Sequence, residues 1–74
     1  MMNVPELKKR LAELRALFPE LLRRDCVRLK REFDRAVSAL EGKPETAGHL
    51  INALSFQVQR ARKRSIAGIA EDLR

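Results

Sequence analysis

Apolar residues recur at intervals of three and four along most of the chain, which is the spacing of one face of an α-helix. In the first stretch the recurring residues are leucines: Leu7, Leu11 and Leu14. Asn3 followed by Glu6 resembles a capping box in which Asn replaces the usual Ser or Thr, and Pro5 is tolerated in a first helical turn. The pattern predicts a helix over about residues 5–17.

A second apolar stripe starts after Pro19. Proline disfavours helical geometry at the preceding residue and suits the first position of a new helix, so we favour a break there over one long helix kinked at Pro19. The stripe then runs through Leu22, Cys26, Leu29, Phe33, Val37 and Leu40. It predicts a helix over about residues 19–41 with Gly42 as its C-terminal cap, followed by a turn at residues 42–44.

A third stripe follows the turn, and Thr46 is placed to cap its helix. Its apolar positions are Ala47, Leu50, Leu54, Val58 and Ala61, with Ile51 beside them. The small residues at both ends of the stripe favour a close approach of helices, and the stripe predicts a helix over about residues 46–64. Residues 65–74 keep a helical spacing but include Gly68, which costs a helix about 1 kcal/mol relative to Ala. They are either a short fourth helix or a tail.

No alternation of apolar and polar residues is long enough to predict a strand. The predicted fold class is therefore all-α, with residues 1–74 as a single helical domain. It is either a small three-helix bundle or a helical hairpin with an additional packed N-terminal helix. The second and third helices are joined by a short turn and should pack antiparallel. A chain of 74 residues buries a modest core, and small domains often gain stability by dimerising.

The net charge of the chain indicates which classes of partner are favoured. Sixteen Lys and Arg against ten Asp and Glu give a net charge of +6. This balance favours polyanions, which include nucleic acid, an anionic membrane surface and an acidic protein. No apolar run approaches the length of a membrane span, and the N-terminus lacks the regions of a secretory signal. Together with a single unpaired cysteine, these features predict a cytoplasmic protein.

An arginine stripe on the second predicted helix is the first candidate contact surface. Its members recur at intervals of four, three and four, so they share one face, opposite the apolar stripe: Arg24, Arg28, Arg31 and Arg35. Guanidinium groups match phosphate geometry, so the stripe fits a nucleic-acid backbone. Asp25 and Glu32 have the spacing for ion pairs along the helix, so a solvated, internally paired face is the other interpretation. The sequence leaves both open.

A basic run at the end of the third predicted helix is the second candidate surface. Its cations are Arg60, Arg62, Lys63 and Arg64. No acidic residue lies within six positions on either side, so no sequence neighbour neutralises the run. Arg60, Lys63 and Arg64 should share the outer face, whereas Arg62 points nearer the apolar stripe. Cations favour a helix C-terminus by about 0.3–1 kcal/mol each, but four of them favour contact with a polyanion.

The remaining aromatic and reactive residues do not predict a catalytic site. Phe56 falls on the polar side of the third helix, and burial under the first helix or a protein interface fits it better than base stacking. Cys26 lies in the apolar stripe and is interpreted as a core residue, and His49 is single. There is no Gly-rich phosphate loop and no spacing of metal ligands. We expect no enzymatic activity, no cofactor and no metal site.

Residues 22–33, with the sequence Leu-Arg-Arg-Asp-Cys-Val-Arg-Leu-Lys-Arg-Glu-Phe, resemble a segment ahead of the motor in bacterial DEAH-box RNA helicases of the HrpA type. In that family an Arg-Asp pair is followed by arginines and an apolar residue in a helix, and the positions that match are Arg24, Asp25, Arg28, Leu29, Arg31 and Phe33. The layout is similar too, with a second helix that has a basic end and residues 71–73 where the motor would begin. The chain lacks the nucleotide-binding and DEAH motifs and the Tyr-Pro approach to the motor, so ATPase activity and unwinding are not transferred. The resemblance implies an accessory module that contacts RNA or protein.

Two classes of function fit these features. The first is a non-catalytic helical module that binds nucleic acid, RNA before DNA, with low sequence specificity. The alternative is a protein–protein interaction module that uses the same helices, either on an acidic protein surface or in a homodimer. An amphipathic helix on a membrane surface fits less well, because the apolar face lacks Trp and the acidic residues dilute the charge.

Overall fold

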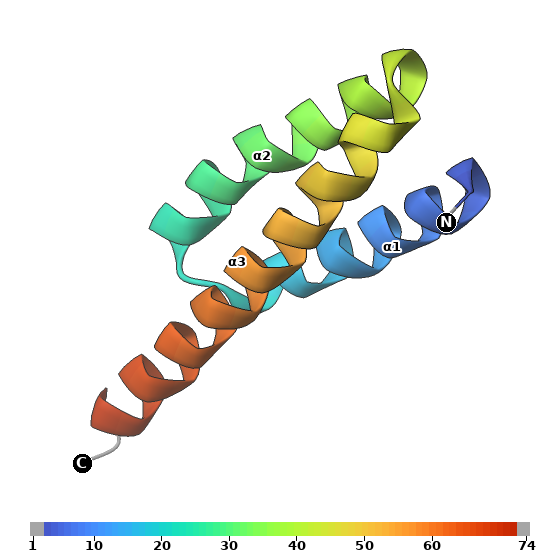
Figure 1. Ribbon diagram of the computed structural model, residues 1–74. Coiled ribbons are helices and arrows are strands. Elements are labelled where there is room, and N and C mark those ends of the chain that lie inside the picture. The colour runs from blue at the N-terminus through green and yellow to red at the C-terminus, as the bar shows by residue number, and fades with distance from the viewer. Residues whose placement is uncertain (1–2, 73–74) are drawn as a thin grey trace.

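The structure is a computed structural model that describes residues 3–72, with the side chains of residues 3–67. Its helices are α1 over Val4–Leu17, a short 3-10 helix η1 over Phe18–Glu20, α2 over Arg23–Gly42 and α3 over Pro44–Asp72. Figure 1 shows that α2 and α3 form an antiparallel hairpin and that α1 lies along it. The predicted all-α fold is confirmed, and residues 3–72 contain no strand.

The start of α1 follows the local signals in the sequence. Asn3 has an extended backbone, and its side-chain oxygen accepts a hydrogen bond from the Glu6 N–H at 3.0 Å. Pro5 lies in the first turn, where an N–H would have no helical acceptor. The predicted cap is confirmed.

The chain breaks at Pro19, as predicted, but the second helix begins later than expected. Phe18–Glu20 form the 3-10 turn, and the backbone is extended at Leu21 and Leu22. The prediction of a start near residue 19 is therefore wrong, because α2 begins at Arg23.

The packing of Phe18 explains this connection. Its side chain is buried and meets the Phe33 ring edge-on, with 6.0 Å between the ring centroids. The Phe18 carbonyl accepts a hydrogen bond from the Cys26 thiol at 3.0 Å. These contacts place the 3-10 turn against the first half of α2, so the chain needs the two extended residues before it can start that helix.

The hairpin turn differs from the predicted caps. Gly42 is the last residue of α2, and no residue in the described range has a positive φ, so Gly42 does not serve as a left-handed cap. Lys43 ends the helix, with its N–H donating to the Ala39 carbonyl at 2.7 Å. α3 begins at Pro44 rather than at a cap on Thr46, because proline suits the first position of a helix.

α3 is one continuous helix of 29 residues, about 43 Å long at 1.5 Å per residue. Residues 65–72 extend it, so they form neither a separate fourth helix nor a non-helical tail, and residues 73–74 lie outside the described residues. A glycine at position 68 lowers helix stability by about 1 kcal/mol, which does not stop a helix that is already nucleated. Figure 1 shows the C-terminal turns of α3 projecting beyond the other two helices.

The core lies where the three helices meet. Its buried hydrophobic residues are Leu7, Leu11, Leu14, Phe18, Leu21, Leu29, Ala36, Leu40, Ala47, Ile51, Leu54, Val58 and Ala61. On α3 the predicted stripe is confirmed, except that Ile51 is fully buried and Leu50 only partly. Alanines on both helices of the hairpin are fully buried, which fits the close approach expected from small residues.

The buried side of α2 is displaced toward α3 relative to the predicted stripe. The buried residues of this helix are Asp25, Leu29, Ala36 and Leu40. Cys26 and Phe33 are only partly buried, and Val37 is 37% exposed. This displacement arises because α2 makes its most extensive interface with α3 rather than with α1. As a result the arginine stripe borders α3 instead of facing directly away from the core.

Candidate functional site

Asp25 joins the two basic surfaces that the sequence predicts. Only 6% of its side chain is exposed, although the residue is charged. Arg64 donates to it from Nη2 to Oδ1 at 3.0 Å and from Nε to Oδ2 at 3.4 Å. Arg28 donates from Nη2 to Oδ1 at 3.4 Å. One carboxylate therefore holds an arginine of the α2 stripe beside an arginine of the α3 basic run.

These contacts hold the pKa of Asp25 below its usual value. The hydrogen bond from Arg64 lowers the pKa most, and the hydrogen bond from Arg28 and both positive charges act in the same direction. Burial raises the pKa, because it disfavours the charged form. The arginines outweigh burial, so the fold favours the ionised carboxylate.

Arg28 also contacts α3 directly. Its Nη1 donates to Gln57 Oε1 at 3.0 Å, so its guanidinium bridges α2 and α3 while half of its side chain stays exposed. Gln57 was not among the predicted site residues. Nothing in the sequence distinguishes it from other polar residues on α3, because its role depends on the packing of two helices.

The arginine stripe is partly paired and partly free. Arg28 and Arg35 form ion pairs along the helix, with Asp25 at 3.4 Å and with Glu32 at 3.7 Å. The pairing expected from the spacing of these acids is confirmed. Arg24 and Arg31 are exposed, and neither forms an ion pair with a described side chain. The internally paired interpretation is thus confirmed for Arg28 and Arg35, and the phosphate-binding interpretation stays a prediction for Arg24 and Arg31.

Two members of the basic run on α3 have acidic partners, which come from distant parts of the chain and not from sequence neighbours. Arg62 pairs with Glu20 of η1 at 3.4 Å and Arg64 pairs with Asp25 of α2 at 3.0 Å. These acids lie 42 and 39 positions away in the sequence, so no local spacing could have revealed them. Arg60 and Lys63 are exposed and form no ion pair with a described side chain.

The directions of these side chains also differ in part from the prediction. Arg64 turns toward α2 to reach Asp25, so only Arg60 and Lys63 occupy the outer face as expected. Arg62 is half-buried beside the core, as predicted, and its buried Nε has no hydrogen-bond partner among the described atoms.

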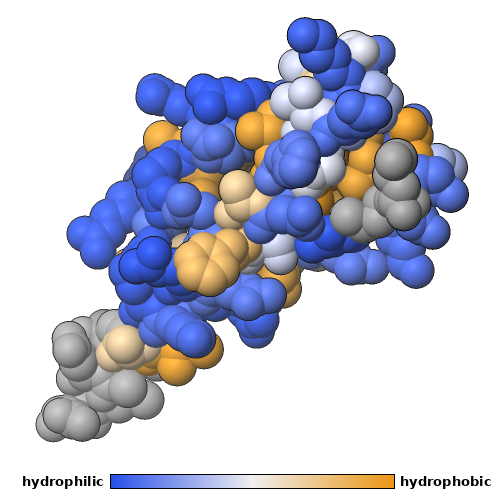
Figure 2. All heavy atoms as spheres, in the orientation of Figure 1, coloured by the Kyte–Doolittle hydropathy of each residue, from blue (hydrophilic) through white to orange (hydrophobic). Residues whose placement is uncertain are grey.

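Phe56 is exposed on the outer face of α3. The alternative of burial under the first helix is wrong, because 64% of the residue is accessible to solvent. The Arg60 guanidinium lies over its ring, 5.8 Å from the centroid. The two residues line a surface hollow of about 540 Å³ together with Gln59, Lys63 and Arg64. Figure 2 shows that hydrophilic side chains cover most of the viewed surface, with small apolar areas between them.

Other residues of potential chemical interest lie apart from this surface. Cys26 is half-buried, as part of the apolar contact between the helices, and its thiol points to the Phe18 and Leu21 carbonyls. His49 is exposed near the start of α3. The described side chains include no group of three or more potential ligands placed to hold a metal ion.

Comparisons with protein-family models, curated proteins and solved structures give no match. The resemblance to helicases of the HrpA type therefore stays a prediction. In the part of the chain that the structure describes, no helix is long and apolar enough to cross a bilayer.

Proposed function

We propose that this protein binds nucleic acid without catalysis, through a surface that we call the α2–α3 face. This face consists of Arg24, Arg28, Arg31, Phe56, Arg60 and Lys63. The observation that carries the proposal is an exposed phenylalanine beside cations that have no acidic partner among the described side chains.

The unpaired cations supply the attraction. Arg24 and Arg31 of α2 and Arg60 and Lys63 of α3 are exposed, so they can approach phosphates without first breaking an ion pair. The contact between Arg28 and Gln57 joins the arginine-bearing flank of α2 to α3, the helix that carries Arg60 and Lys63. A polyanion that contacts both helices would therefore meet cations from each.

Phe56 supplies a surface for a base. Every nucleobase has a flat π-face, so stacking on an exposed aromatic ring tolerates any sequence. Arg60 already lies over this ring, and the hollow beside it has room for a planar group. Stacking requires an unstacked base, so the proposal favours single strands over duplexes.

The same features favour low sequence specificity. Guanidinium and ammonium groups that contact phosphates carry no information about the bases. The resemblance to the helicase accessory region adds a preference for RNA over DNA and for a cytoplasmic accessory role beside a helicase-like protein. The Arg24-Asp25 pair that carries the resemblance lies at the junction of α2 and α3, because Asp25 binds Arg64.

The test is a titration with single- and double-stranded RNA and DNA of equal length at two salt concentrations. We expect single-stranded RNA to bind most tightly and the affinity to fall steeply with salt. The test variant is the double variant Arg60→Ala/Lys63→Ala. The slope of the logarithm of its binding constant against the logarithm of the salt concentration, which we call the salt slope, should be smaller in magnitude by about 1.4, if each residue contacts one phosphate of a single strand. Phe56→Ala should weaken binding with the salt slope unchanged, because stacking releases no counterion.

A charge-matched control separates this face from net charge. Arg60→Glu/Lys63→Glu should abolish binding, whereas Lys9→Glu/Lys43→Glu changes the net charge equally at exposed positions on α1 and in the hairpin turn. Equal losses in both variants would contradict the assignment of the face. Failure of the unaltered protein to bind any nucleic acid at low salt would refute the proposal and favour an acidic protein partner.

A further inference from the structure

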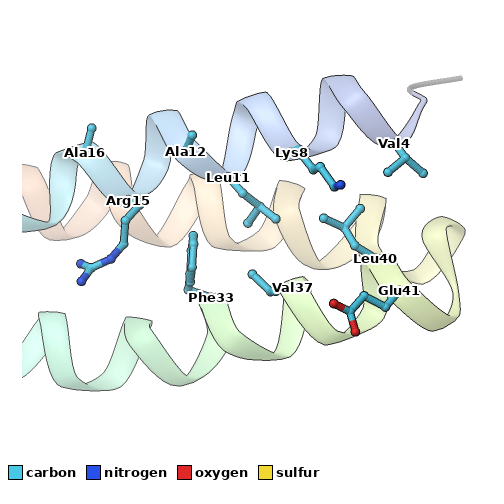
Figure 3. Close-up of a pocket in the computed structure, with 10 residues that line it drawn as sticks. All are labelled: Val4, Lys8, Leu11, Ala12, Arg15, Ala16, Phe33, Val37, Leu40 and Glu41. Atoms are coloured by element: carbon cyan, nitrogen blue, oxygen red, sulfur yellow. The ribbon is translucent and has the colours of Figure 1, made fainter.

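An apolar groove runs between α1 and α2 on the flank of α2 opposite the arginine stripe. Its hollow has a volume of about 670 Å³. Figure 3 shows side chains from both helices around it, with Ala12 and Ala16 on the α1 wall and Phe33 and Val37 on the α2 wall. The groove stays open because α1 makes a more extensive interface with α3 than with α2.

The side chains on the two walls of the groove differ in size at one height. Figure 3 shows the small side chain of Ala12 on the α1 wall at the height of the large Phe33 ring on the α2 wall, whereas larger side chains such as Leu11 line the α1 wall elsewhere. A wall with large side chains packs best against one with small side chains, because the protrusions of one fill the recesses of the other. At the height of Ala12 and Phe33, the α1 wall is thus complementary to the α2 wall of a second copy.

The two walls also differ in charge. Lys8 on α1 and Glu41 on α2 lie at the same end of the groove, as Figure 3 shows. Both are exposed, and no described side chain forms an ion pair with either. The α1 wall therefore offers a cation, and the α2 wall an anion, at the same height.

We propose that the groove binds the groove of a second copy of this chain, with a twofold axis parallel to the groove. This rotation places α1 of one protomer on α2 of the other. It leaves the position of each residue along the groove axis unchanged. Ala12 then faces Phe33 of the other protomer, and Lys8 faces its Glu41. Symmetry forms each contact twice, as an isologous interface requires.

The helix directions favour the same arrangement. α1 and α2 run antiparallel within one protomer (Figure 1), and the rotation keeps every direction along the axis. α1 of one protomer is therefore antiparallel to α2 of the other protomer, which it contacts. This arrangement places the positive end of one helix dipole beside the negative end of the other. The α2–α3 face of each protomer remains uncovered, so dimerisation and the proposed nucleic-acid binding are separate properties.

Sedimentation equilibrium or light scattering over a range of concentrations tests the proposal. We expect a concentration-dependent dimer, and we expect Val37→Asp to make it monomeric. Val37 is partly exposed, so this variant should keep its helical circular dichroism. A protein that is strictly monomeric at millimolar concentration would overturn the proposal, as would a dimer that persists unchanged in Val37→Asp.

A charge exchange tests the predicted axis. Lys8→Glu or Glu41→Lys alone replaces two attractions with two repulsions, so each should weaken dimerisation by about tenfold. The double variant Lys8→Glu/Glu41→Lys restores opposite charges across the interface and should recover the original dissociation constant. Recovery supports the arrangement. A double variant as weak as the two single variants would overturn it.

Discussion

The two flanks of α2 are built differently. On one flank Asp25 and Gln57 tie the helix to α3 through hydrogen bonds to arginines. On the other flank α2 meets α1 across an apolar groove that is only partly filled. The paired flank fixes the geometry of the hairpin and carries the surplus positive charge at its edge. The open flank exposes apolar surface. The surface proposed to bind polyanions and the surface proposed to bind a second copy therefore lie on opposite flanks of α2.

The largest expected effect separates the buried and open sides of α2. Leu29→Ala should lower the free energy of unfolding by about 3 kcal/mol, because Leu29 is fully buried and truncation leaves a cavity. Val37→Ala, at another position of the predicted stripe, should cost less than about 1 kcal/mol because it is partly exposed. Urea unfolding followed by circular dichroism measures both. Similar losses would contradict the difference between the flanks.

The next effect concerns the paired flank. Asp25→Ala should destabilise the fold by about 2 kcal/mol, since it removes three hydrogen bonds and leaves Arg28 and Arg64 without their acid. Both arginines are about half exposed and regain water, so the loss stays below that of a fully buried pair. Glu32→Ala is the control. It removes one long surface ion pair and should cost less than about 0.5 kcal/mol in the same unfolding experiment.

The lowered pKa of Asp25 predicts a dependence of stability on pH. Its contribution should be complete above the pKa of an unfolded Asp, about 3.9, and should disappear as the pH falls through the lower pKa of the folded state. Thermal unfolding between pH 5 and about 2 measures this loss. In Asp25→Asn the decline should be shallower. An identical acid profile in both proteins would show that other carboxylates cause the decline.

The smallest predicted effect concerns the stability of α3 and involves neither proposed binding surface. Gly48 lies inside α3, and a methyl group at this position would face open space, with no side chain or other helix within 4 Å. Gly48→Ala should therefore raise the stability by about 0.5–1 kcal/mol through higher helix propensity. The melting temperature should rise, while nucleic-acid affinity and dimerisation stay as they are, because the position belongs to neither surface. A lower melting temperature would contradict this prediction.

Local signals predicted much of the fold. The Asn3 cap and the break at Pro19 depend on residues within a few positions, and the structure confirms both. The apolar spacing identified the core of α3, where Leu54 and Val58 are buried. The helix starts at Arg23 and Pro44 were missed, because packing at Phe18 and proline geometry at the turn overrode the nominal caps.

The site was less predictable, because long-range contacts decide which cations remain free. Alanine fits a core or a surface, and an acidic residue is expected at the surface, so the sequence did not reveal that Ala36 and Asp25 are both buried on one face of α2. Glu20 and Arg62 meet over a separation of 42 residues. Once these pairs form, Arg60 and Lys63 remain as the unpaired cations of the predicted basic run among the described side chains.

The buried carboxylate of Asp25 also bears on how the hairpin selects its alignment. Two antiparallel helices with apolar stripes can slide past each other by one turn and still bury leucines and alanines. In such a slipped state Asp25 would lose both hydrogen bonds from Arg64 and keep only the longer contact with Arg28 of its own helix, at a cost of about 1–3 kcal/mol. We expect Asp25→Leu to keep the helices but admit the slipped state, visible as doubled NMR signals from α3; a single set would contradict this. One acid would thereby exclude misaligned hairpins that hydrophobic burial alone tolerates.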